Sequence, residues 1–214
     1  MAAATGTTES TFDFLPEEIS YPALKSASGE CRGCHLYKNA TQTVFGEGDV
    51  RSGVIFVGEQ PGDEEDLTGR PFVGPAGRLF DRALEQAGID RKRIYLTNAV
   101  KHFKWKPQGK RRLHQKPSAA EIRACDPWLR SEIVLIKPRI LVCLGATAAQ
   151  SLFGKDFRVT QMHGQWIENE LAPNTLATIH PSAILRTPGD LRDAAFADFV
   201  SDLVIVAEAI DKGA

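Results

Sequence analysis

The stretch Val54-Ile-Phe-Val-Gly-Glu-Gln-Pro-Gly62 decides the fold class of this chain. It joins four consecutive apolar residues to a turn that contains two glycines and a proline. A continuous apolar run of this length is typical of a strand buried on both faces, as in a parallel sheet. The turn follows the strand directly, so we expect a sharp reversal with exposed backbone N–H groups at the strand's carboxyl end.

Three further apolar runs along the chain predict strands of the same kind, and helical patterns separate them. The strands are expected at residues 93–98, 140–144 and 175–179, and the helices at 77–86, 118–136, 145–153 and 191–210. The second helix opens with the capping box Ser118-Ala-Ala-Glu121. Strands that alternate with helices predict an α/β fold, a three-layer αβα sandwich around a central, mainly parallel four-stranded sheet. Ligand sites are expected beyond the carboxyl ends of such strands.

The composition is that of one ordinary folded domain. The chain has 214 residues, of which 43% are hydrophobic and 25% are charged, which excludes wholesale disorder. Its longest apolar runs are about five residues, far below the roughly 18 that a membrane span requires. No basic residue precedes Lys25 and no apolar segment lies there, so we expect no secretory signal and a cytoplasmic protein. We expect a mobile tail over residues 1–25, a single domain over 26–214, and a monomer.

Four cysteines are the first candidate for a metal site. The spacing is C-x2-C, then 90 residues, then C-x17-C, formed by Cys31, Cys34, Cys125 and Cys143. Four thiolates suit a tetrahedral zinc ion or a 4Fe–4S cluster, and a disulfide framework is unexpected in a cytosolic chain. A zinc ribbon usually has a second close pair, which favours iron and sulfur here. The alternative is a metal-free pair with two core cysteines, because Cys143 lies inside an apolar run.

A basic segment is the candidate surface for nucleic acid. Lys101 to Lys116 holds seven Lys or Arg residues and no acid, with Phe103 and Trp105 interleaved. That mixture is typical of a nucleic-acid-binding surface, although a solvated loop is the plainer interpretation. His114 lies among these basic residues, which favour its neutral, nucleophilic form. By contrast, Glu59 to Asp66 holds five acids and no base.

Polar and aromatic side chains with recognition chemistry follow the predicted strands. Glu59 lies in the turn after the first strand, Asn98 ends the second, and His180 follows the fourth. An amide offers a donor and an acceptor in one plane, which suits a base edge, and an imidazole can donate to a carbonyl oxygen. Phe72, in a Gly/Pro-rich loop, could stack on a planar base. Each also has a purely structural interpretation, as turn, strand end, core histidine or core ring.

Together, these motifs resemble the iron–sulfur uracil-DNA glycosylases of family 4, over residues 28 to 210. The matching segments are Gly58–Gly62, Gly69–Gly77, Thr97-Asn98, Cys143-Leu-Gly145 and His180-Pro-Ser182, with the four cysteines. Two features differ from ordinary family 4 sequences and resemble those of the family's cross-linking branch, uracil-DNA glycosylase X. The turn reads GEQPG where family 4 typically has GEAPG. Lys110-Arg-Arg-Leu-His114 is similar to that branch's KRRIH insertion, with Leu113 in place of isoleucine.

The resemblance implies a role for each candidate residue. The four cysteines would ligate a structural 4Fe–4S cluster, and uracil would be flipped out of DNA. Phe72 would stack on the ring, Asn98 would read its polar edge, and His180 would stabilise the departing uracil anion. His114 would attack C1′ of the sugar with support from Glu59. Gly58 and Gln60 would also bind uracil. The residues that would bind DNA are Lys110, Arg111, Arg112 and Arg186.

The sequence therefore predicts an enzyme that excises uracil from DNA, single-stranded DNA being preferred, and stays attached to the abasic sugar after one turnover. Uracil is the expected product. An ordinary multi-turnover family 4 glycosylase is the first alternative, with His114 touching phosphate only. A non-catalytic iron–sulfur DNA-binding module and a zinc-stabilised α/β hydrolase are more distant ones. The carboxylate, amide and imidazole at the strand ends speak against a binding-only module, which would not need them.

Overall fold

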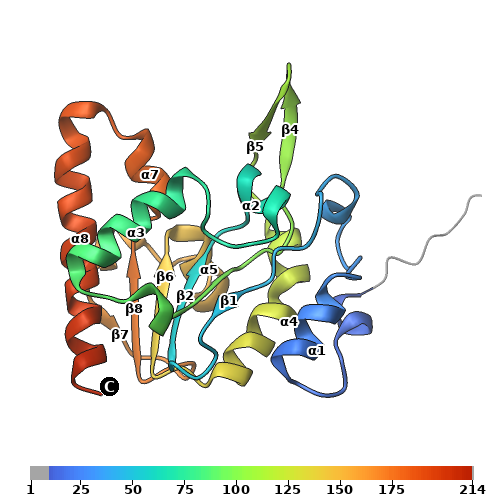
Figure 1. Cartoon of the computed structure of the whole chain (residues 1–214), viewed down its shortest axis with the longest axis horizontal. Coiled ribbons are helices and arrows are strands. Elements are labelled where there is room, and N and C mark those ends of the chain that lie inside the picture. The colour runs from blue at the N-terminus through green and yellow to red at the C-terminus, as the bar shows by residue number, and fades with distance from the viewer. Residues whose placement is uncertain (1–9, 214) are drawn as a thin grey trace, which may run out of the picture.

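A six-stranded sheet runs through the centre of the computed structural model, which describes residues 10–213 (Figure 1). Its strand order is β1-β3-β2-β6-β8-β7. The four predicted strands form its middle and pair in parallel: β2 Val54–Gly58, β3 Tyr95–Asn98, β6 Ile140–Leu144 and β8 Asn174–Thr178. Two-residue strands, β1 Glu47–Gly48 and β7 Trp166–Ile167, add antiparallel edges. The predicted fold class is confirmed, with six strands in place of four.

Helices cover both faces of the sheet, and strand β2 shows why. Phe56 is fully buried against the side formed by α3 (Pro75–Ala87), α7 (Pro181–Arg186) and α8 (Gly189–Asp211). Its neighbour Ile55 is fully buried against the side formed by α4 (Ala119–Ile136) and α5 (Ala146–Phe153). Successive side chains of a strand point to opposite faces, so a run that is apolar at every position needs cover on both.

The helix boundaries agree with the sequence signals. Helix α4 starts with the predicted capping box, in which Ser118 and Glu121 exchange side-chain and backbone hydrogen bonds. It continues through Pro127 to Ile136. The remaining helical elements are short: η1 Thr11–Phe14, α1 Tyr21–Ser28, η2 His35–Lys38, α2 Asp63–Thr68, η3 Arg91–Arg93 and α6 Val159–Met162.

Part of the predicted mobile tail belongs to the folded body. Residues 1–9 lie outside the described part of the chain, but residues 11–14 and 21–28 are helical and contact the body. Thr11 donates a hydrogen bond to the carbonyl oxygen of Ala124 on α4, and Leu24 is fully buried. The boundary expected at residue 25 is therefore corrected: the domain already includes residues 11–25.

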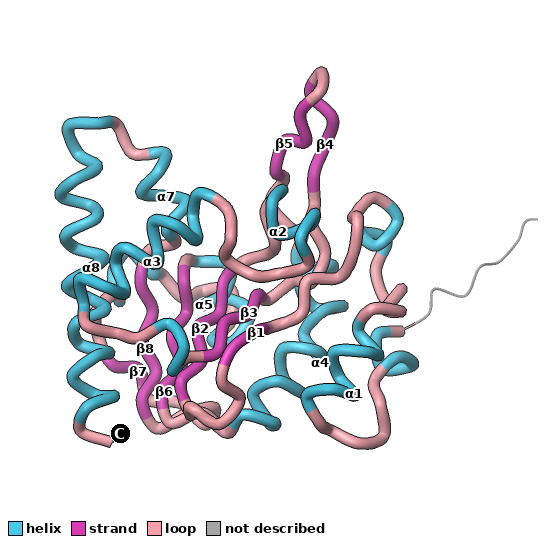
Figure 2. The backbone as a smooth tube through the Cα atoms, viewed as in Figure 1, coloured by secondary structure: helices cyan, strands magenta, loops and turns pink. Residues whose placement is uncertain are grey.

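The basic segment, expected to be a loop, forms a hairpin that stands apart from the main sheet (Figure 2). Strand β4 (Trp105–Gln108) pairs antiparallel with β5 (Arg111–His114) across a two-residue turn. Gly109 in that turn has φ +59°, a left-handed conformation that glycine adopts without strain. Among the described residues, no helix has the length and apolar character to cross a membrane.

Candidate functional site

The carboxyl ends of the parallel strands bring four of the predicted site residues into one place. Gly58 at the end of β2 pairs in register with Asn98 at the end of β3. Glu59 follows β2, and His180 follows β8. Phe72 reaches the same place from the loop before α3. We call Gly58, Phe72, Asn98 and His180 the strand-end cluster.

The strand-end cluster is tight because Gly58 has no side chain. A Cβ atom at this position would lie 2.3 Å from Oδ1 of Asn98 and 2.7 Å from Cζ of Phe72. Asn98 is only 3% exposed, so its amide is held away from solvent. The Phe72 ring centroid lies 5.5 Å from that of Phe80 in the core and 6.3 Å from that of His180. An amide and an aromatic face therefore lie side by side, as recognition of a planar base requires.

Phe72 is held in a conformation that its loop must enforce. Its φ is 55°, in the left-handed region that residues other than glycine rarely adopt. Arg91 donates to the Phe72 carbonyl oxygen over 3.2 Å. Glu65 on α2 accepts the backbone N–H groups of Val73 (3.1 Å) and Gly74 (2.9 Å), where α3 begins. The acidic run seen in the sequence thus serves the scaffold, a role that the sequence interpretation missed.

The protonation state of His180 follows from its hydrogen bonds. Its Nδ1 accepts the backbone N–H of Ser182 over 3.1 Å, and the Ser182 hydroxyl lies 2.8 Å from the same nitrogen. Nδ1 therefore has no proton, and Nε2 keeps one to donate. Burial lowers the pKa of His180 to about 4, so the imidazole is neutral at pH 7.

Glu59 and His114 form a carboxylate–imidazole pair beside the cluster. Nε2 of His114 lies 3.3 Å from Oε1 of Glu59, and Thr147 of α5 donates its hydroxyl to Oε2. Burial raises the pKa of Glu59, but the bonds from His114 and Thr147 outweigh it and hold that pKa below its usual range. Glu59 is thus ionised at neutral pH. Thr147 carried no signal in the sequence, since it lies inside a helical pattern.

The Gln60 side chain is engaged within the protein. Its side-chain Nε2 donates to the carbonyl oxygens of Lys104 (3.3 Å) and Gln115 (3.0 Å), and its Oε1 accepts the N–H of Lys104 (3.1 Å). Lys104 and Gln115 are the residues just before and just after the hairpin. In this structure the Gln60 side chain closes the base of the hairpin that carries His114, and its contact with uracil stays a prediction.

Arg112 is also engaged within the protein, and its contact with DNA stays a prediction. Its guanidinium carbon lies 5.4 Å from the ring centroid of Phe103 and 5.5 Å from that of Trp105. It forms ion pairs with Asp63 and Asp66 of α2, each at 2.5 Å. The side chain is only 19% exposed, so this arginine ties the hairpin to α2.

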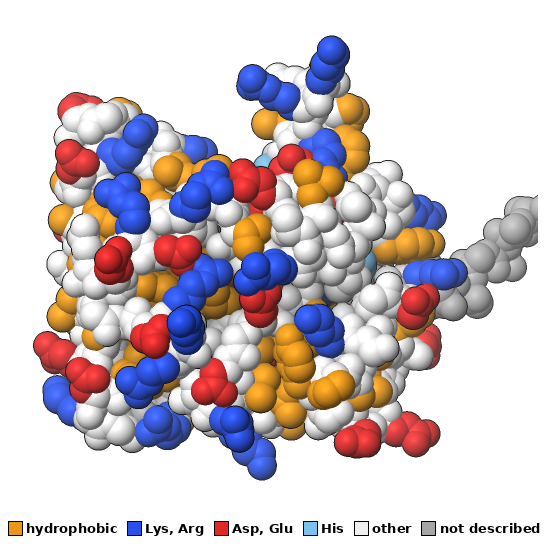
Figure 3. All heavy atoms as spheres, in the orientation of Figure 1, with side chains coloured by type: hydrophobic (Ala, Val, Ile, Leu, Met, Phe, Trp, Pro, Cys, Tyr) orange, Lys and Arg blue, Asp and Glu red, His pale blue; other side chains and the backbone are white. Residues whose placement is uncertain are grey.

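The other basic residues remain available to a ligand. Lys110 and Arg111 are exposed at the hairpin tip, and within residues 10–213 neither takes part in an ion pair. Figure 3 shows basic side chains on this projecting tip. Arg186 is exposed at the end of α7, where it donates to the Ser182 hydroxyl over 3.2 Å. Two places, the hairpin tip and the end of α7, thus offer positive charge.

The structure brings three of the four cysteines together. Cys31, Cys34 and Cys125 belong to one cluster with Trp128. Trp128 donates its indole N–H to the sulfur of Cys31, and Lys101 donates its backbone N–H to that of Cys125, each at 3.2 Å. N–H groups aimed at sulfur are what thiolate ligands of a metal centre require. Within residues 10–213, however, no three His, Cys, Asp or Glu side chains already surround a common point as metal ligands do.

Cys143 does not join this group. It is the next-to-last residue of β6, between Val57 of β2 and Ala177 of β8, and is fully buried in the core on the α4 and α5 side. Burial alone raises the pKa of its thiol. The expectation that Cys143 completes the ligand set is therefore corrected, because a central strand holds it among apolar side chains.

Comparisons with known proteins agree with one another. The family model "Uracil DNA glycosylase superfamily" matches residues 45–204. The Type-4 uracil-DNA glycosylase of Thermotoga maritima is 40% identical over 158 residues, which cover 73% of this chain and 79% of that protein. That of Archaeoglobus fulgidus is 36% identical over 176 residues, covering 79% and 84%. A Type-5 uracil-DNA glycosylase of Pyrobaculum aerophilum is 29% identical over 161 residues, covering 67% of each chain.

Proposed function

Because the chain belongs to the uracil-DNA glycosylase superfamily, we propose that it excises uracil from DNA and then becomes covalently joined, through His114, to C1′ of the sugar. The relatives support the first step. One observation carries the second: Nε2 of His114 lies 3.3 Å from the ionised Glu59, beside the strand-end cluster. Single-stranded DNA is the proposed preferred substrate, and the protein acts as a monomer.

Recognition of uracil rests on the strand-end cluster. The Phe72 ring stacks on the flipped base, and the Asn98 amide pairs with its polar edge. The neutral His180 donates its Nε2 proton to a carbonyl oxygen of uracil. That hydrogen bond strengthens as the base takes up negative charge, so it stabilises the transition state more than the ground state.

The covalent step follows from the pairing of Glu59 with His114. The bond between C1′ and uracil breaks, and both of its electrons leave with the base, which later takes a proton from solvent. The carboxylate of Glu59 stabilises the positive sugar that remains. The imidazole nitrogen that does not face Glu59 gives its lone pair to C1′, and the proton of the other nitrogen passes to Glu59. An imidazole held at C1′ outcompetes water by effective concentration, and the alkylated ring is a poor leaving group.

A 4Fe–4S cluster bound by Cys31, Cys34 and Cys125 is part of this proposal, and its role is structural. The fourth ligand we propose is His102, which is 5% exposed and next in sequence to Lys101, the donor to Cys125. Its Nε2 lies 2.9 Å from the hydroxyl of Thr43, which donates to the carbonyl oxygen of Ser28, the last residue of α1. These four ligands would join the segment after α1, the segment after β3 and helix α4, and thereby support the base of the hairpin.

The test is incubation with uracil-containing single-stranded DNA, followed by a denaturing gel and a measurement of free uracil. We expect one equivalent of uracil per protein and a protein–DNA band that survives SDS and heat. His114→Ala should release uracil without that band, since water then reaches the sugar cation. Glu59→Gln should slow formation of the band. Peptide mass mapping must place the nucleotide on His114; attachment to another residue contradicts the proposed nucleophile.

An ordinary multi-turnover glycosylase is the second candidate, because the relatives in Thermotoga and Archaeoglobus are named Type-4 uracil-DNA glycosylases. Uracil release in excess over protein, with no stable band, would establish that activity instead. Absence of any uracil release would contradict both candidates.

A further inference from the structure

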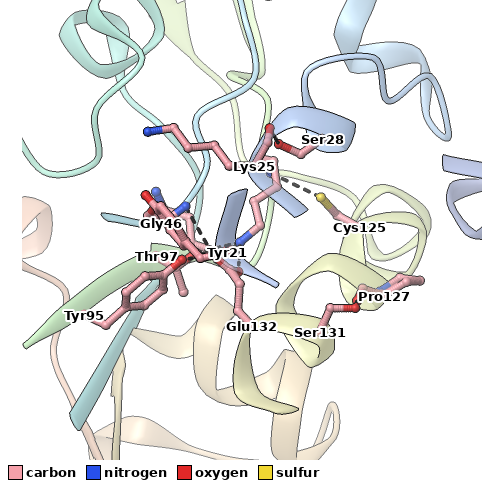
Figure 4. Close-up of polar contacts among 12 residues, drawn as sticks. Tyr21, Lys25, Ser28, Gly46, Tyr95, Thr97, Cys125, Pro127, Ser131 and Glu132 are labelled. Carbon is pink, nitrogen blue, oxygen red and sulfur yellow. Dashed lines mark hydrogen bonds and ion pairs between the residues drawn. The ribbon is translucent and has the colours of Figure 1, made fainter. Parts of the chain in front are cut away.

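A buried ion pair between Lys101 and Glu132 lies behind the strand-end cluster. The sequence placed Lys101 in the basic surface segment, but the side chain is buried, and Glu132 had not been singled out. Lys101 is 1% exposed and Glu132 of α4 is fully buried, and the ammonium contacts Oε2 of the carboxylate. Figure 4 shows Glu132 of α4 together with Tyr95 and Thr97 of β3, whose hydroxyls donate to its carboxylate. Burying two charges is costly, so such a pair persists only where its geometry and its other hydrogen bonds compensate.

Every proton of the ammonium and both oxygens of the carboxylate have partners. Besides Glu132, the Lys101 ammonium donates to the hydroxyl of Thr97 at 2.6 Å and to the carbonyl oxygen of Asn98 at 2.9 Å. Glu132 accepts the hydroxyls of Tyr95 (2.9 Å) and Thr97 (2.9 and 3.0 Å). All hydrogen-bonding groups of the ion pair are therefore satisfied. One of the hydrogen bonds reaches the backbone carbonyl oxygen of Asn98.

That contact fixes the peptide unit on which the Asn98 side chain depends. The peptide between Asn98 and Ala99 has its carbonyl oxygen on the Lys101 ammonium and its N–H on the carbonyl oxygen of Gly58, at 2.9 Å. Held at both ends, it cannot rotate, so the Cα–Cβ direction of Asn98 is set. Asn98 is the last residue of β3 and pairs in register with Gly58 of β2, so the Lys101 ammonium adds to the pairing that already orients this peptide.

We propose that Lys101 and Glu132 are positioning residues for uracil recognition, which act by holding the Asn98–Ala99 peptide so that the Asn98 amide meets the base edge. This inference rests on the proposed excision of uracil and adds two residues that do not touch the base. An ion pair buried behind the reading amide gives that amide a fixed direction, which a solvent-exposed asparagine would lack.

The experiment is a double-mutant cycle between Lys101→Met and Asn98→Ala, measured on the full chain. The readouts are the single-turnover rate of uracil release from single-stranded DNA and the affinity for the same DNA with thymine. We expect Lys101→Met alone to slow release by roughly tenfold or more, the effect of losing a hydrogen bond to a charged group, without loss of affinity. In the Asn98→Ala background it should cause little further loss, because both changes disable one contact.

Stability must be separated from positioning. Lys101→Met leaves Glu132 charged and unpaired, so the double variant Lys101→Met/Glu132→Gln removes both charges and keeps acceptors for Tyr95 and Gly46. We expect its melting temperature to recover toward wild type while uracil release stays slow. If Lys101→Met alone does not fold, this variant takes its place in the cycle. The exposed Lys92→Met, in η3 at the opposite end of β3, is the matched control and should release uracil at the wild-type rate.

Two results overturn the inference. Additive losses in the cycle would mean that Lys101 acts independently of Asn98, and recovery of the release rate together with the melting temperature would mean a purely structural role. Wild-type protein that releases no uracil contradicts the proposed function instead, so the two failures are distinguishable.

Discussion

Two side chains at the site, Glu59 and His180, have different charges at neutral pH. Glu59 is held ionised by His114 and Thr147, while burial keeps His180 neutral. Breaking a glycosidic bond places positive charge on the sugar and negative charge on the base. In the proposed mode of binding, the Glu59 carboxylate lies beside the sugar and the neutral His180 N–H lies beside the base, so the two groups match the two charges.

The titration of His180 predicts how stability depends on pH. The folded protein has a His180 pKa of about 4, against an ordinary value of 6.5. Between these values the unfolded chain binds a proton that the folded protein does not, so the free energy of unfolding falls as the pH is lowered from 6.5 to about 4. Chemical denaturation across this range should show a shallower fall for His180→Gln than for wild type.

Glu59 provides the control for that measurement. Its lowered pKa also makes stability fall with acid, but over the lower range in which carboxylates titrate. Glu59→Gln should therefore keep the fall between pH 6.5 and about 4 that His180 causes. Equal slopes for wild type and His180→Gln above pH 5 would show that His180 is not kept neutral by the fold.

At the scale of elements, the hairpin is positioned by contacts at its base. Gln60 hydrogen-bonds the residues on both sides of it, and Arg112 ties it to α2. The hairpin in turn holds His114 against Glu59. The position of His114, the proposed nucleophile, is therefore decided by Gln60 and Arg112.

Gln60→Ala should uncouple the two steps of the reaction. The variant loses three hydrogen bonds at the hairpin base, so His114 is held at Glu59 for a smaller fraction of time. We expect uracil release close to the wild-type rate, with adduct formed more slowly and water capturing part of the sugar. The measurement is the ratio of adduct to released uracil over time. Gln108→Ala at the exposed hairpin tip is the matched control, and an unchanged ratio for Gln60→Ala would contradict the clamping role.

The cysteines give a second prediction at this scale. Cys125→Ser should lose iron and visible absorbance, since Cys125 belongs to the group that includes Cys31 and Cys34. Cys143→Ala should keep both, because that thiol behaves as a small apolar side chain within β6. Iron determination on the two purified variants checks this. Loss of iron from Cys143→Ala alone would restore the original four-cysteine set.

The sequence predicted the elements that carry a strong burial signal and missed those that do not. The central strands were found because burial on both faces demands apolar residues at every position, as at Val54 to Val57. Edge strands β1 and β7 are two residues long and leave no pattern. The hairpin was missed because its exposed strands need no apolar face.

The same reasoning explains which site residues were found. Glu59, Asn98 and His180 follow strands directly, so their convergence could be predicted from topology alone. The contacts of Gln60 and Arg112 depend on how the hairpin folds back on the body, which no local pattern encodes. Cys143 was misassigned because spacing was given more weight than its apolar neighbours.

At the scale of the whole molecule, exposed positive charge lies on the hairpin tip, the surface that we expect DNA to approach. The overall charge is −1, yet the hairpin tip presents Lys110 and Arg111 on a projecting surface (Figure 3). The acids of α2 lie behind it and are occupied by Arg112 and by backbone N–H groups. The two basic side chains of the tip are thus not neutralised by the acidic run.

Removing the tip charges should weaken DNA binding without regard to sequence. Lys110→Gln/Arg111→Gln should lower affinity and reduce the slope of log K against log salt by roughly 1.4 for single strands, about 0.7 per phosphate contact. Binding is measured by fluorescence anisotropy at several salt concentrations. The exposed Lys92→Gln in η3 removes one positive charge away from the site and should leave the slope unchanged. The same slope for wild type and the double variant would show that the tip faces away from DNA.

The closure of the hairpin at one glutamine has a consequence for protein engineering. Residues 105–114 leave and re-enter the body at adjoining points, where Gln60 holds Lys104 and Gln115. The strands that form the strand-end cluster do not run through this excursion. The length of the excursion and the residue at position 114 can therefore be varied without changing the sequence of these strands, provided that the ion pairs of Arg112 with α2 are kept. With the proposed covalent attachment at His114, such variants would serve as covalent labels for uracil in DNA.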